Sequence, residues 1–305
     1  MARFDKDTAG LSFVIPAYNE SAAIVSTIKR LQAVLPTLNL HYEIIVVDDG
    51  SRDDTRAQAL ACDVTVIGHP VNTGYGSALK SGIAVSRYDW IGIVDADGTY
   101  DIERLPELVD RMRDGFDMVV ASRRNVLQTD PPFKRFCRKS MISLLNLVIA
   151  AKIADPNSGF RVFSKEIVKT FFPFLCNTFS FTTSLTVFAL GEGYFVSYVP
   201  MEYAARVGKS KVRHFRDSLR MIQLIIQGIT YFNPVKFFII MALMLVAVGL
   251  VPALALMAFN WDQLAEYYFL TVLAMFLLVG MGVLGDISRI STITKVGGRH
   301  ASLSG

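Results

Sequence analysis

The chain has 305 residues and a net charge of +4, from 31 Lys and Arg against 27 Asp and Glu, a balance that does not indicate a nucleic-acid-binding protein. Its three cysteines, Cys62, Cys137 and Cys176, fit neither a disulfide framework nor a zinc site, so we expect buried thiols in a reducing compartment. Hydrophobic residues make up 52% of the sequence and the mean hydropathy is +0.38, which is more apolar than a soluble enzyme of this length. The apolar excess follows Pro234, which predicts one soluble domain and a membrane anchor.

The N-terminal part of the chain has the pattern of an α/β domain. Residues 1–10 lack the apolar region and cleavage site of a secretory signal, so we expect this domain to stay in the cytosol. Strand-length apolar runs then alternate with helix-length segments, as in a parallel sheet covered by helices. The predicted strands are 11–17, 42–48, 64–68, 90–94 and 117–121, and the predicted helices are 21–35, 53–60, 76–86 and 102–113.

The C-terminal part has the pattern of a membrane anchor. Residues 215–232 predict either an interfacial amphipathic helix or a helix that faces the core. Residues 235–259 and 267–284 are each near or above the roughly 20 residues that cross a bilayer, and flanking Lys and Arg place both chain ends in the cytosol. The predicted divisions are a cytosolic domain (1–212), an interfacial helix (213–233), a two-helix anchor (234–288) and a cytosolic tail (289–305).

Acidic and polar residues follow three of the predicted strands. The first strand ends in PAYNE (16–20), the second in DDGS (48–51) and the fourth in DADG (95–98). Because ligands bind beyond the carboxyl ends of parallel strands, we expect these segments to form one site. Carboxylates at this edge can accept hydrogen bonds from a nucleobase or a ribose, and Tyr18 can flank the base. Segment 48–55 is also consistent with a simple helix start capped by Ser51 or Asp53.

Asp95 and Asp97 form a DxD pair after a buried strand. A turn can aim both carboxylates at one Mg²⁺ or Mn²⁺ ion, and such an ion also binds the oxygens of a diphosphate. The pair alone equally fits an acidic turn without a ligand. Its occurrence beside the other acidic strand ends favours a site for a nucleotide diphosphate.

Two glycines, Gly74 and Gly76, open the helix that carries Lys80. A nicotinamide dehydrogenase would have its glycine motif after the first strand, where this chain has PAYNE, so we reject a dinucleotide site. We expect the glycines to give room for close backbone approach to a nucleotide, with Lys80 near phosphate.

The motifs together resemble family 2 glycosyltransferases of the GT-A fold, and specifically the polyprenyl-phosphate glycosyltransferases, which include dolichol-phosphate mannosyltransferase. The matching segments are PAYNE (16–20), DDGSRDDT (48–55), NTGYGSALKSG (72–82), DADGTYDIERLPEL (95–108), ASRR (121–124), DPNSGFRVFSKE (155–166) and RVGKSK (206–211). The resemblance implies a mixed, mostly parallel α/β sheet with flanking helices.

The resemblance also implies which residues bind the donor. The nucleotide-sugar residues are Pro16, Tyr18, Glu20, Asp48, Asp49, Lys80, Asp95 and Ala96, and the metal ligands are Asp95 and Asp97. The family often has Gln two residues after the second DxD aspartate, where this chain has Thr99. A hydroxyl or a bound water would have to replace that ligand.

The acceptor side is implied by basic residues and one acid. Arg123, Arg138, Arg161 and Lys209 are assigned to the phosphate of a lipid acceptor, because guanidinium groups suit phosphate oxygens. The basic residues at 134–139 also fit a solvated face beside anionic headgroups. Residues 140–151 are either core or a wall that dips into the membrane.

The resemblance assigns Asp97, Asp155 and Arg123 to catalysis. Asp155 occupies the place of a general base in many GT-A enzymes. A lipid phosphate is already anionic near neutral pH and needs no strong base, so Asp155 is alternatively expected to orient the acceptor or an arginine such as Arg161, or to satisfy its own loop.

The expected function is inverting, metal-dependent transfer of a sugar from a UDP- or GDP-sugar to undecaprenyl or dolichyl phosphate at the cytosolic membrane face. The expected partners are the donor, the lipid acceptor and the bilayer, with no nucleic acid and with a homo-oligomer as a further option. The alternatives are a non-catalytic scaffold with a nucleotide-sugar fold, a glycosyltransferase with another lipid or polysaccharide acceptor, and a flippase. A processive polysaccharide synthase would carry QxxRW and more spans, and neither is found in this sequence.

Overall fold

The computed structural model describes residues 10–124, 135, 139, 142–143, 145–146, 152–178, 180–203, 234–247 and 261–301. The chain divides into two compact units, residues 1–222 and 223–305, which are described separately. The predictions for Arg138, Lys209 and the helix at 213–233, and most of that for 140–151, concern residues outside the described ranges.

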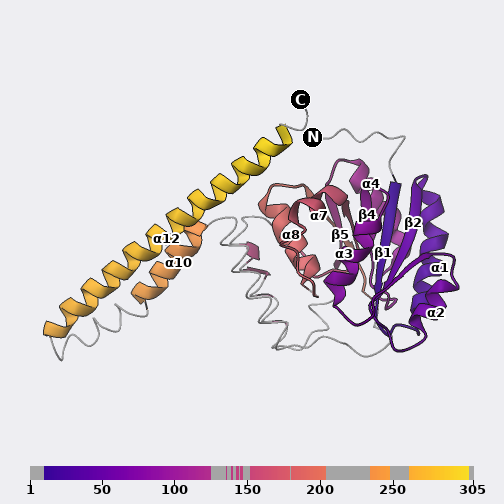
Figure 1. Ribbon diagram of the computed structural model, residues 1–305, viewed down its shortest axis with the longest axis horizontal. Coiled ribbons are helices and arrows are strands. Elements are labelled where there is room, and N and C mark those ends of the chain that lie inside the picture. The colour runs from indigo at the N-terminus through magenta and orange to yellow at the C-terminus, as the bar shows by residue number, and fades with distance from the viewer. Residues whose placement is uncertain are drawn as a thin grey trace. The chain divides into compact units, whose positions relative to one another are not determined.

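The first unit is built on a twisted sheet with helices on both faces (Figure 1). Within the described residues the order of its strands is β3-β2-β1-β4-β6-β5-β7, and β6 alone runs antiparallel to its neighbours. The strands are β1 (Gly10–Ala17), β2 (His41–Asp48), β3 (Thr65–Gly68), β4 (Trp90–Ile93), β5 (Met118–Arg123), β6 (Arg161–Ser164) and β7 (Val196–Met201). The predicted mixed, mostly parallel α/β sheet is therefore confirmed.

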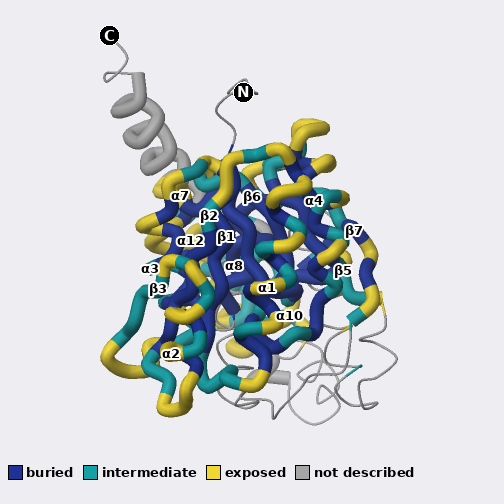
Figure 2. The backbone as a smooth tube through the Cα atoms, turned by 90° about the vertical axis from the view of Figure 1, so that its right-hand side faces the viewer, coloured by how far each residue is buried: buried dark blue, intermediate teal, exposed yellow. Residues whose placement is uncertain are grey.

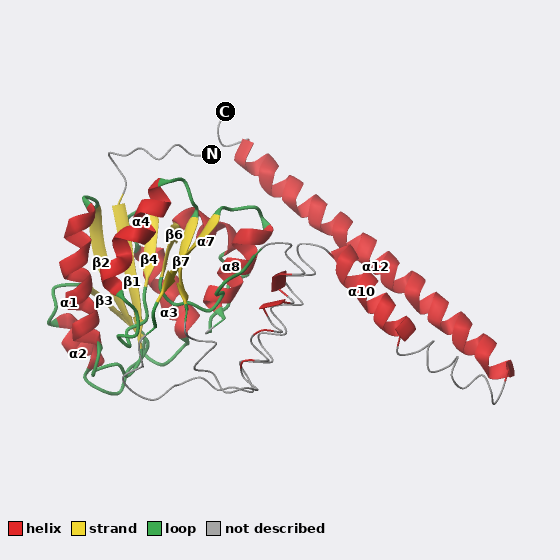
Figure 3. Ribbon diagram, turned by 180° about the vertical axis from the view of Figure 1, so that it is seen from behind, coloured by secondary structure: helices red, strands yellow, loops and turns green. Residues whose placement is uncertain are grey.

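The helices of this unit lie against the sheet (Figure 3). On α4, Leu105, Leu108, Val109 and Met112 recur at helical spacing and are all buried. The helices of this unit are α1 (Ile24–Val34), α2 (Thr55–Leu60), α3 (Tyr75–Val85), α4 (Leu105–Arg113), α7 (Lys165–Phe171) and α8 (Phe181–Gly191), with the 3₁₀ helices η1 (Leu35–Leu38) and η2 (Ile102–Arg104).

Alternate residues of the central strand β1 face different helix layers. Phe13 and Ile15 belong to the core that includes α1 and α4, whereas Val14 lies against Gly82 of α3 on the opposite face. Figure 2 shows that β1 is buried along its whole length. Each fully buried Ile or Phe stabilises the fold by about 1.5–3 kcal/mol, so this two-sided core holds the strand ends in fixed positions.

The strand order creates a switch point between β1 and β4. From β1 the chain builds β2 and β3 on one side, and it then crosses to place β4 on the other side, parallel to β1. In open α/β sheets, ligands bind outside the carboxyl ends of the strands at such a point. The fold therefore directs the loops after Ala17 and Ile93 toward one location.

The second unit contains α10 (Pro234–Leu245) and α12 (Trp261–Ala301), which pack against each other. Gly282 of α12 lies close to Val235 and Phe238, where a Cβ atom would approach the Val235 Cα to 3.2 Å. Small residues of this kind allow close packing of membrane helices.

One segment among the described residues has the length and composition of a membrane span. This segment, Glu266–Gly285 in α12, has a mean hydropathy of 2.2. Much of the first predicted span, residues 248–259, lies outside the described ranges. The two-span anchor and its orientation remain predictions.

Candidate active site

The loops after β1 and β2 are tied together at the carboxyl edge of the sheet. The backbone N–H of Asn19 donates to Ser51 Oγ at 2.9 Å, and the N–H of Arg52 donates to Asn19 Oδ1 at 2.8 Å. The N–H of Glu20 donates to Thr55 Oγ1 at 2.8 Å. These bonds fix the segment that carries Pro16, Tyr18 and Glu20 beside the second acidic strand end.

Asp48 and Asp49 are both buried but have different surroundings. Asp48 accepts a 3.3 Å hydrogen bond from the N–H of Ser51. Asp49 accepts hydrogen bonds from the N–H and hydroxyl of Thr73 at 2.9 and 2.8 Å and from the N–H of Gly74 at 2.8 Å, and it lies 2.7 Å from His69 Nδ1. Asp49 therefore organises the loop before α3, and its contact with a nucleotide stays a prediction.

Asp95 follows β4 and is held by two features of other segments. The Tyr75 hydroxyl donates to Asp95 Oδ1 at 2.8 Å, and Gly159 packs against the same carboxylate. A Cβ atom at position 159 would lie 2.3 Å from Asp95 Oδ2, so a larger residue there would displace this carboxylate. Burial, together with the charge of Asp95, raises the pKa of Tyr75 well above its usual range, so the hydroxyl remains a donor.

Asp97 is buried and is held by Thr99. The Thr99 hydroxyl donates to Asp97 Oδ1 at 2.7 Å, and the Thr99 N–H donates to the same atom at 3.2 Å. Ala96, between the two aspartates, is buried, and its carbonyl accepts a 3.3 Å hydrogen bond from Thr27. In this structure Thr99 thus orients Asp97 from the position where the family often has Gln.

The two aspartates suit a hard divalent cation that also binds a ligand. Among the described residues no group of three or more His, Cys, Asp or Glu side chains is arranged to hold a metal. A cation at Asp95 and Asp97 would need further oxygen ligands, and a diphosphate supplies oxygens of the kind that Mg²⁺ and Mn²⁺ prefer. The donor set fits a cation that binds together with a nucleotide diphosphate.

Arg123 and Asp155 form a buried ion pair at the end of β5. Arg123 Nε donates to Asp155 Oδ2 at 2.7 Å and Nη2 donates to Oδ1 at 2.8 Å, with the two side chains 12% and 10% exposed. Burial raises the pKa of the Asp155 carboxyl, but the hydrogen bonds and charge of Arg123 outweigh burial and leave the pKa below its usual value of 3.8. A carboxylate held in this way is a weak base.

Arg161 has a structural role, which corrects its assignment to an acceptor phosphate. The side chain is 0% exposed on β6. Its guanidinium donates to the carbonyl of Ser158 at 3.0 Å, to that of Thr182 at 3.1 Å and to the Thr186 hydroxyl at 2.9 Å. It therefore joins the loop before β6 to α8, and the arginine that Asp155 orients is Arg123.

Lys80 of α3, and the glycines Gly74 and Gly76 at the start of this helix, have neighbours within the protein. Lys80 Nζ donates to the Leu175 carbonyl at 2.6 Å and to Asn177 Oδ1 at 2.7 Å. A Cβ atom at Gly76 would lie 2.1 Å from the Cys176 carbonyl oxygen. The close backbone approach at this motif is therefore to residues 176–177, and the contact of Lys80 with phosphate stays a prediction.

Three residues at this edge of the sheet were not predicted from the sequence as site residues, namely Tyr75, Gly159 and Tyr203. Tyr75 and Gly159 stand inside the motifs NTGYG and DPNSG, so their position in the motif was a usable signal. Tyr203 follows β7, and its ring lies 5.3 Å from the Arg123 guanidinium carbon. No motif marked Tyr203.

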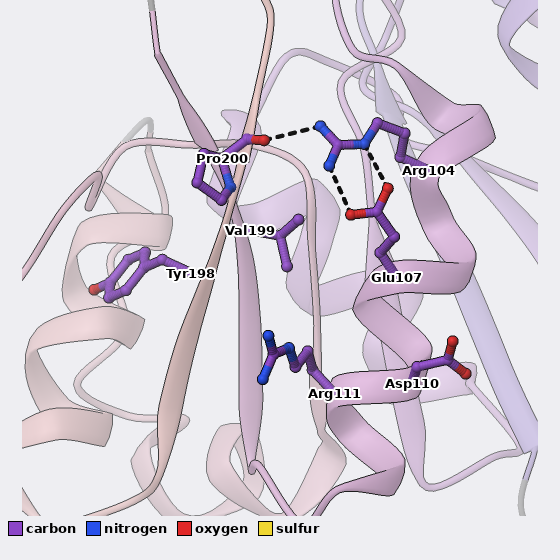
Figure 4. Close-up of a pocket in the computed structure, with 7 residues that line it drawn as sticks. All are labelled: Arg104, Glu107, Asp110, Arg111, Tyr198, Val199 and Pro200. Carbon is purple, nitrogen blue, oxygen red and sulfur yellow. Dashed lines mark hydrogen bonds and ion pairs between the residues drawn. The ribbon is translucent and has the colours of Figure 1, made fainter.

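A hollow of about 330 Å³ lies on another part of the sheet, between α4 and β7 (Figure 4). Its rim carries an ion pair between Arg104 and Glu107, and Arg104 also donates to the Pro200 carbonyl at 2.8 Å. None of the predicted site residues lines it. We therefore place the candidate active site at the carboxyl edge.

Comparisons with solved structures show the same fold. Glucosyl-3-phosphoglycerate synthase from Mycobacterium tuberculosis in complex with phosphoglyceric acid matches with a TM-score of 0.61 and 22% identity, over 73% of this chain and 81% of that chain. A structure of the same enzyme with Mg²⁺ and uridine diphosphate matches with a TM-score of 0.59 and 21% identity, over 73% and 80% of the two chains.

Curated relatives extend the similarity over both units. The undecaprenyl-phosphate 4-deoxy-4-formamido-L-arabinose transferase of Klebsiella pneumoniae subsp. pneumoniae is 30% identical over 92% of this chain and 88% of its own length. The low-salt glycan biosynthesis hexosyltransferase Agl6 of Haloferax volcanii is 29% identical over 73% of this chain and 54% of its own. The model of Glycosyl transferase family 2 matches residues 12–172, which is more than half of the sequence. The chain therefore belongs to glycosyltransferase family 2.

Proposed function

We propose that this glycosyltransferase transfers a sugar from a nucleoside-diphosphate sugar to a polyprenyl phosphate at the cytosolic face of a membrane. The observation that carries the proposal is that two acidic residues and one arginine stand at the same edge of the sheet. Asp95 and Asp97 follow β4, Arg123 ends β5, and β6 alone separates the two strands. Neighbouring strands are about 4.8 Å apart, so the backbone positions that carry these groups stand about 10 Å apart across the sheet, which leaves room for a diphosphate and an acceptor phosphate on either side of one sugar.

The donor end uses acidic side chains. We assign the cation to Asp95 and Asp97, and the nucleotide to the neighbouring strand ends, where Pro16, Tyr18, Glu20 and Asp48 lie. Bound Mg²⁺ or Mn²⁺ would neutralise charge on the departing diphosphate. The solved complexes of the tuberculosis enzyme with Mg²⁺ or Mn²⁺ and uridine diphosphate support this assignment.

The acceptor end uses Arg123, with Asp155 as a positioning residue. A phosphate oxygen of the lipid attacks the anomeric carbon, the bond from that carbon to the nucleoside diphosphate breaks, and the configuration inverts. The attacking phosphate is already anionic at neutral pH, so the reaction needs no proton acceptor. This matches the lowered pKa of Asp155, whose carboxylate holds Arg123 toward the phosphate and is a poor general base.

The lipid acceptor accords with the second unit of the chain. Glu266–Gly285 has the length and composition of a span, and the Klebsiella relative is named for its use of undecaprenyl phosphate. A membrane-anchored enzyme meets a polyprenyl phosphate in the same bilayer. A soluble sugar acceptor would require no anchor.

The test is a donor panel on the full-length chain in membranes. Membranes are incubated with UDP- and GDP-sugars and undecaprenyl phosphate, and lipid-linked sugar is extracted and identified. Asp97→Asn and EDTA treatment should each abolish product, whereas Asp110→Asn, at an exposed site on α4, should leave it unchanged. Absence of product with every donor would favour a non-catalytic scaffold, and full activity in EDTA would refute the metal assignment.

A further inference from the structure

The loop 155–160, which precedes β6, contacts both ends of the candidate active site. At its start, Asp155 accepts hydrogen bonds from the Arg123 guanidinium at 2.7 and 2.8 Å and from the Arg123 N–H at 3.2 Å. Further along the loop, Gly159 lies against the Asp95 carboxylate. The loop therefore touches the arginine assigned to the acceptor and one of the aspartates assigned to the donor.

Arg161 holds this loop in place. It directly follows the loop as the first residue of β6, and its side chain is fully buried. Its Nη2 donates to the Pro156 carbonyl at 3.2 Å, and its Nε donates to the Ser158 carbonyl at 3.0 Å. Its Nη1 donates to the Thr182 carbonyl at 3.1 Å and to the Thr186 hydroxyl at 2.9 Å. One guanidinium thus ties two carbonyls of the loop to α8.

The backbone of Arg161 lies between the two strands that carry the site. In the register of the sheet it pairs with Ile93 at the end of β4 and with Val120 of β5. Ile93 stands two residues before Asp95, and Val120 stands three residues before Arg123. The loop is therefore held by a residue whose own place is fixed relative to both strand ends.

The surroundings of Arg161 suit a guanidinium in particular. The oxygen atoms that accept its hydrogen bonds in the described part of the chain all belong to neutral groups. A buried charge is costly unless its hydrogen bonds are made, and the planar fork of arginine presents donors in several directions at once. A lysine would keep the charge but would offer all its donors from a single atom. Lysine at this position therefore cannot tie the loop to α8 in the same way.

We propose that Arg161 is a positioning residue that holds the loop 155–160 where it supports both Arg123 and Asp95. This inference rests on the proposed function, because it assigns Asp95 to the donor and Arg123 to the acceptor. If one residue supports both ends through one loop, loosening it weakens cation binding and acceptor binding together. A general loss of stability in the folded enzyme would weaken neither.

The experiment compares Thr186→Val with Arg161→Lys in the full-length chain purified in detergent. Thr186→Val removes one hydrogen-bond acceptor of Arg161, and it should raise both the half-saturating Mn²⁺ concentration and the KM for undecaprenyl phosphate by roughly 3- to 10-fold. Arg161→Lys loses the fork and should raise both quantities by about tenfold or more. Mn²⁺ saturation is measured calorimetrically with UDP and with GDP, independently of turnover.

Ser86→Ala is the matched control for Thr186→Val. The buried Ser86 hydroxyl donates to the Gly82 carbonyl at 2.9 Å, just as the buried Thr186 hydroxyl donates to the Thr182 carbonyl at 2.9 Å. Ser86 stands at the end of α3, before β4 begins, and so at the edge of the sheet opposite the site. Ser86→Ala should lower Tm while both quantities stay within about twofold of wild type.

The outcomes distinguish this proposal from the proposed function. Wild-type values of both quantities in Thr186→Val would overturn the positioning role, whatever its Tm, and a rise in only one of them would overturn the shared support of the two ends. If Arg161→Lys does not fold, Thr186→Val alone decides the matter. An absence of lipid-linked product from the wild-type enzyme would instead overturn the proposed function. In that case the Mn²⁺ titration of Thr186→Val would still test the support of Asp95.

Discussion

Replacing Asp155 with Asn is the most direct test of the buried ion pair. The substitution keeps the shape of the side chain but removes its charge, and it leaves the Arg123 guanidinium buried without a counterion. We expect a loss of stability together with a higher KM for the lipid acceptor. A general base would instead be expected to show its effect in kcat, with little change in stability.

The structure sets the size of the stability loss. Removing one partner of a buried ion pair typically costs about 3–5 kcal/mol, and the lower end applies because Asn retains an oxygen that can accept one Arg123 hydrogen bond. The side chains are 12% and 10% exposed, so solvent screening is minor. About 3 kcal/mol corresponds to a decrease of about 6–12 °C in Tm for a domain of this size.

The assay is thermal unfolding of the full-length protein in detergent, in a double-mutant cycle with Arg123→Met. The double variant removes both charges and should recover about 2 kcal/mol relative to the sum of the single losses. Asp110→Asn breaks an exposed pair on α4 and serves as the matched control, with a change of less than about 0.5 kcal/mol. Strictly additive losses at Asp155 and Arg123 would refute the reasoning.

The stability that the Arg123–Asp155 ion pair contributes depends on pH. The pKa of Asp155 is lower in the folded protein than its usual value of 3.8, so the unfolded chain takes up the proton first as the pH falls. The stabilisation is therefore complete above about pH 4 and is lost as the pH falls through the folded pKa. Wild type and Asp155→Asn should accordingly converge in Tm at acidic pH, and a constant difference down to pH 2 would contradict the pairing.

Three further substitutions test the other contacts of the site. Tyr75→Phe removes the hydrogen bond to Asp95 and should raise the half-saturating Mn²⁺ concentration by roughly 3- to 10-fold. The control Tyr42→Phe, at an exposed residue of β2, should leave that concentration unchanged. Gly159→Ala puts a methyl group 2.3 Å from an Asp95 oxygen and should abolish measurable Mn²⁺ binding, and wild-type binding in this variant would show that the carboxylate does not need its present position. Lys80→Met should lower Tm while the donor KM stays within about twofold, and a tenfold rise in donor KM at unchanged Tm would restore Lys80 to the phosphate site.

Much of the sheet was predictable from the sequence because its first half follows a simple alternation of strands and helices. The five predicted strands are all present, with their ends shifted by a few residues. Strands β6 and β7 were not predicted. β6 has four residues, and its first, Arg161, is a buried charge that breaks the apolar pattern. The carbonyl groups of Ser158 in the preceding loop and of Thr182 in α8 accept its hydrogen bonds.

The positions of the predicted site residues in the fold were predictable where each residue directly follows a strand, whereas their roles stay predictions. Asp95 and Asp97 lie at the carboxyl edge as their motif indicates, and Arg123 ends β5 as expected. The roles assigned to Lys80 and Arg161 show the limit of the sequence, because Arg161 is fully buried and Lys80 has protein partners that no motif indicated. A sequence pattern does not reveal that a distant backbone carbonyl has already accepted the hydrogen bonds of a cation, as Leu175 and Ser158 do here.

The place of β6 in the sheet has a consequence for how the chain folds. β6 lies between β4 and β5, yet it is made after both, and its pairing with β4 joins residues about 70 positions apart in the sequence. Until Arg161 has left the ribosome, the inner edge of β4 has no partner, and an unpaired apolar strand edge promotes association between chains. A nascent chain that stops between residues 124 and 160 is therefore expected to aggregate or to need a chaperone, although the residues of its donor end have all been synthesised.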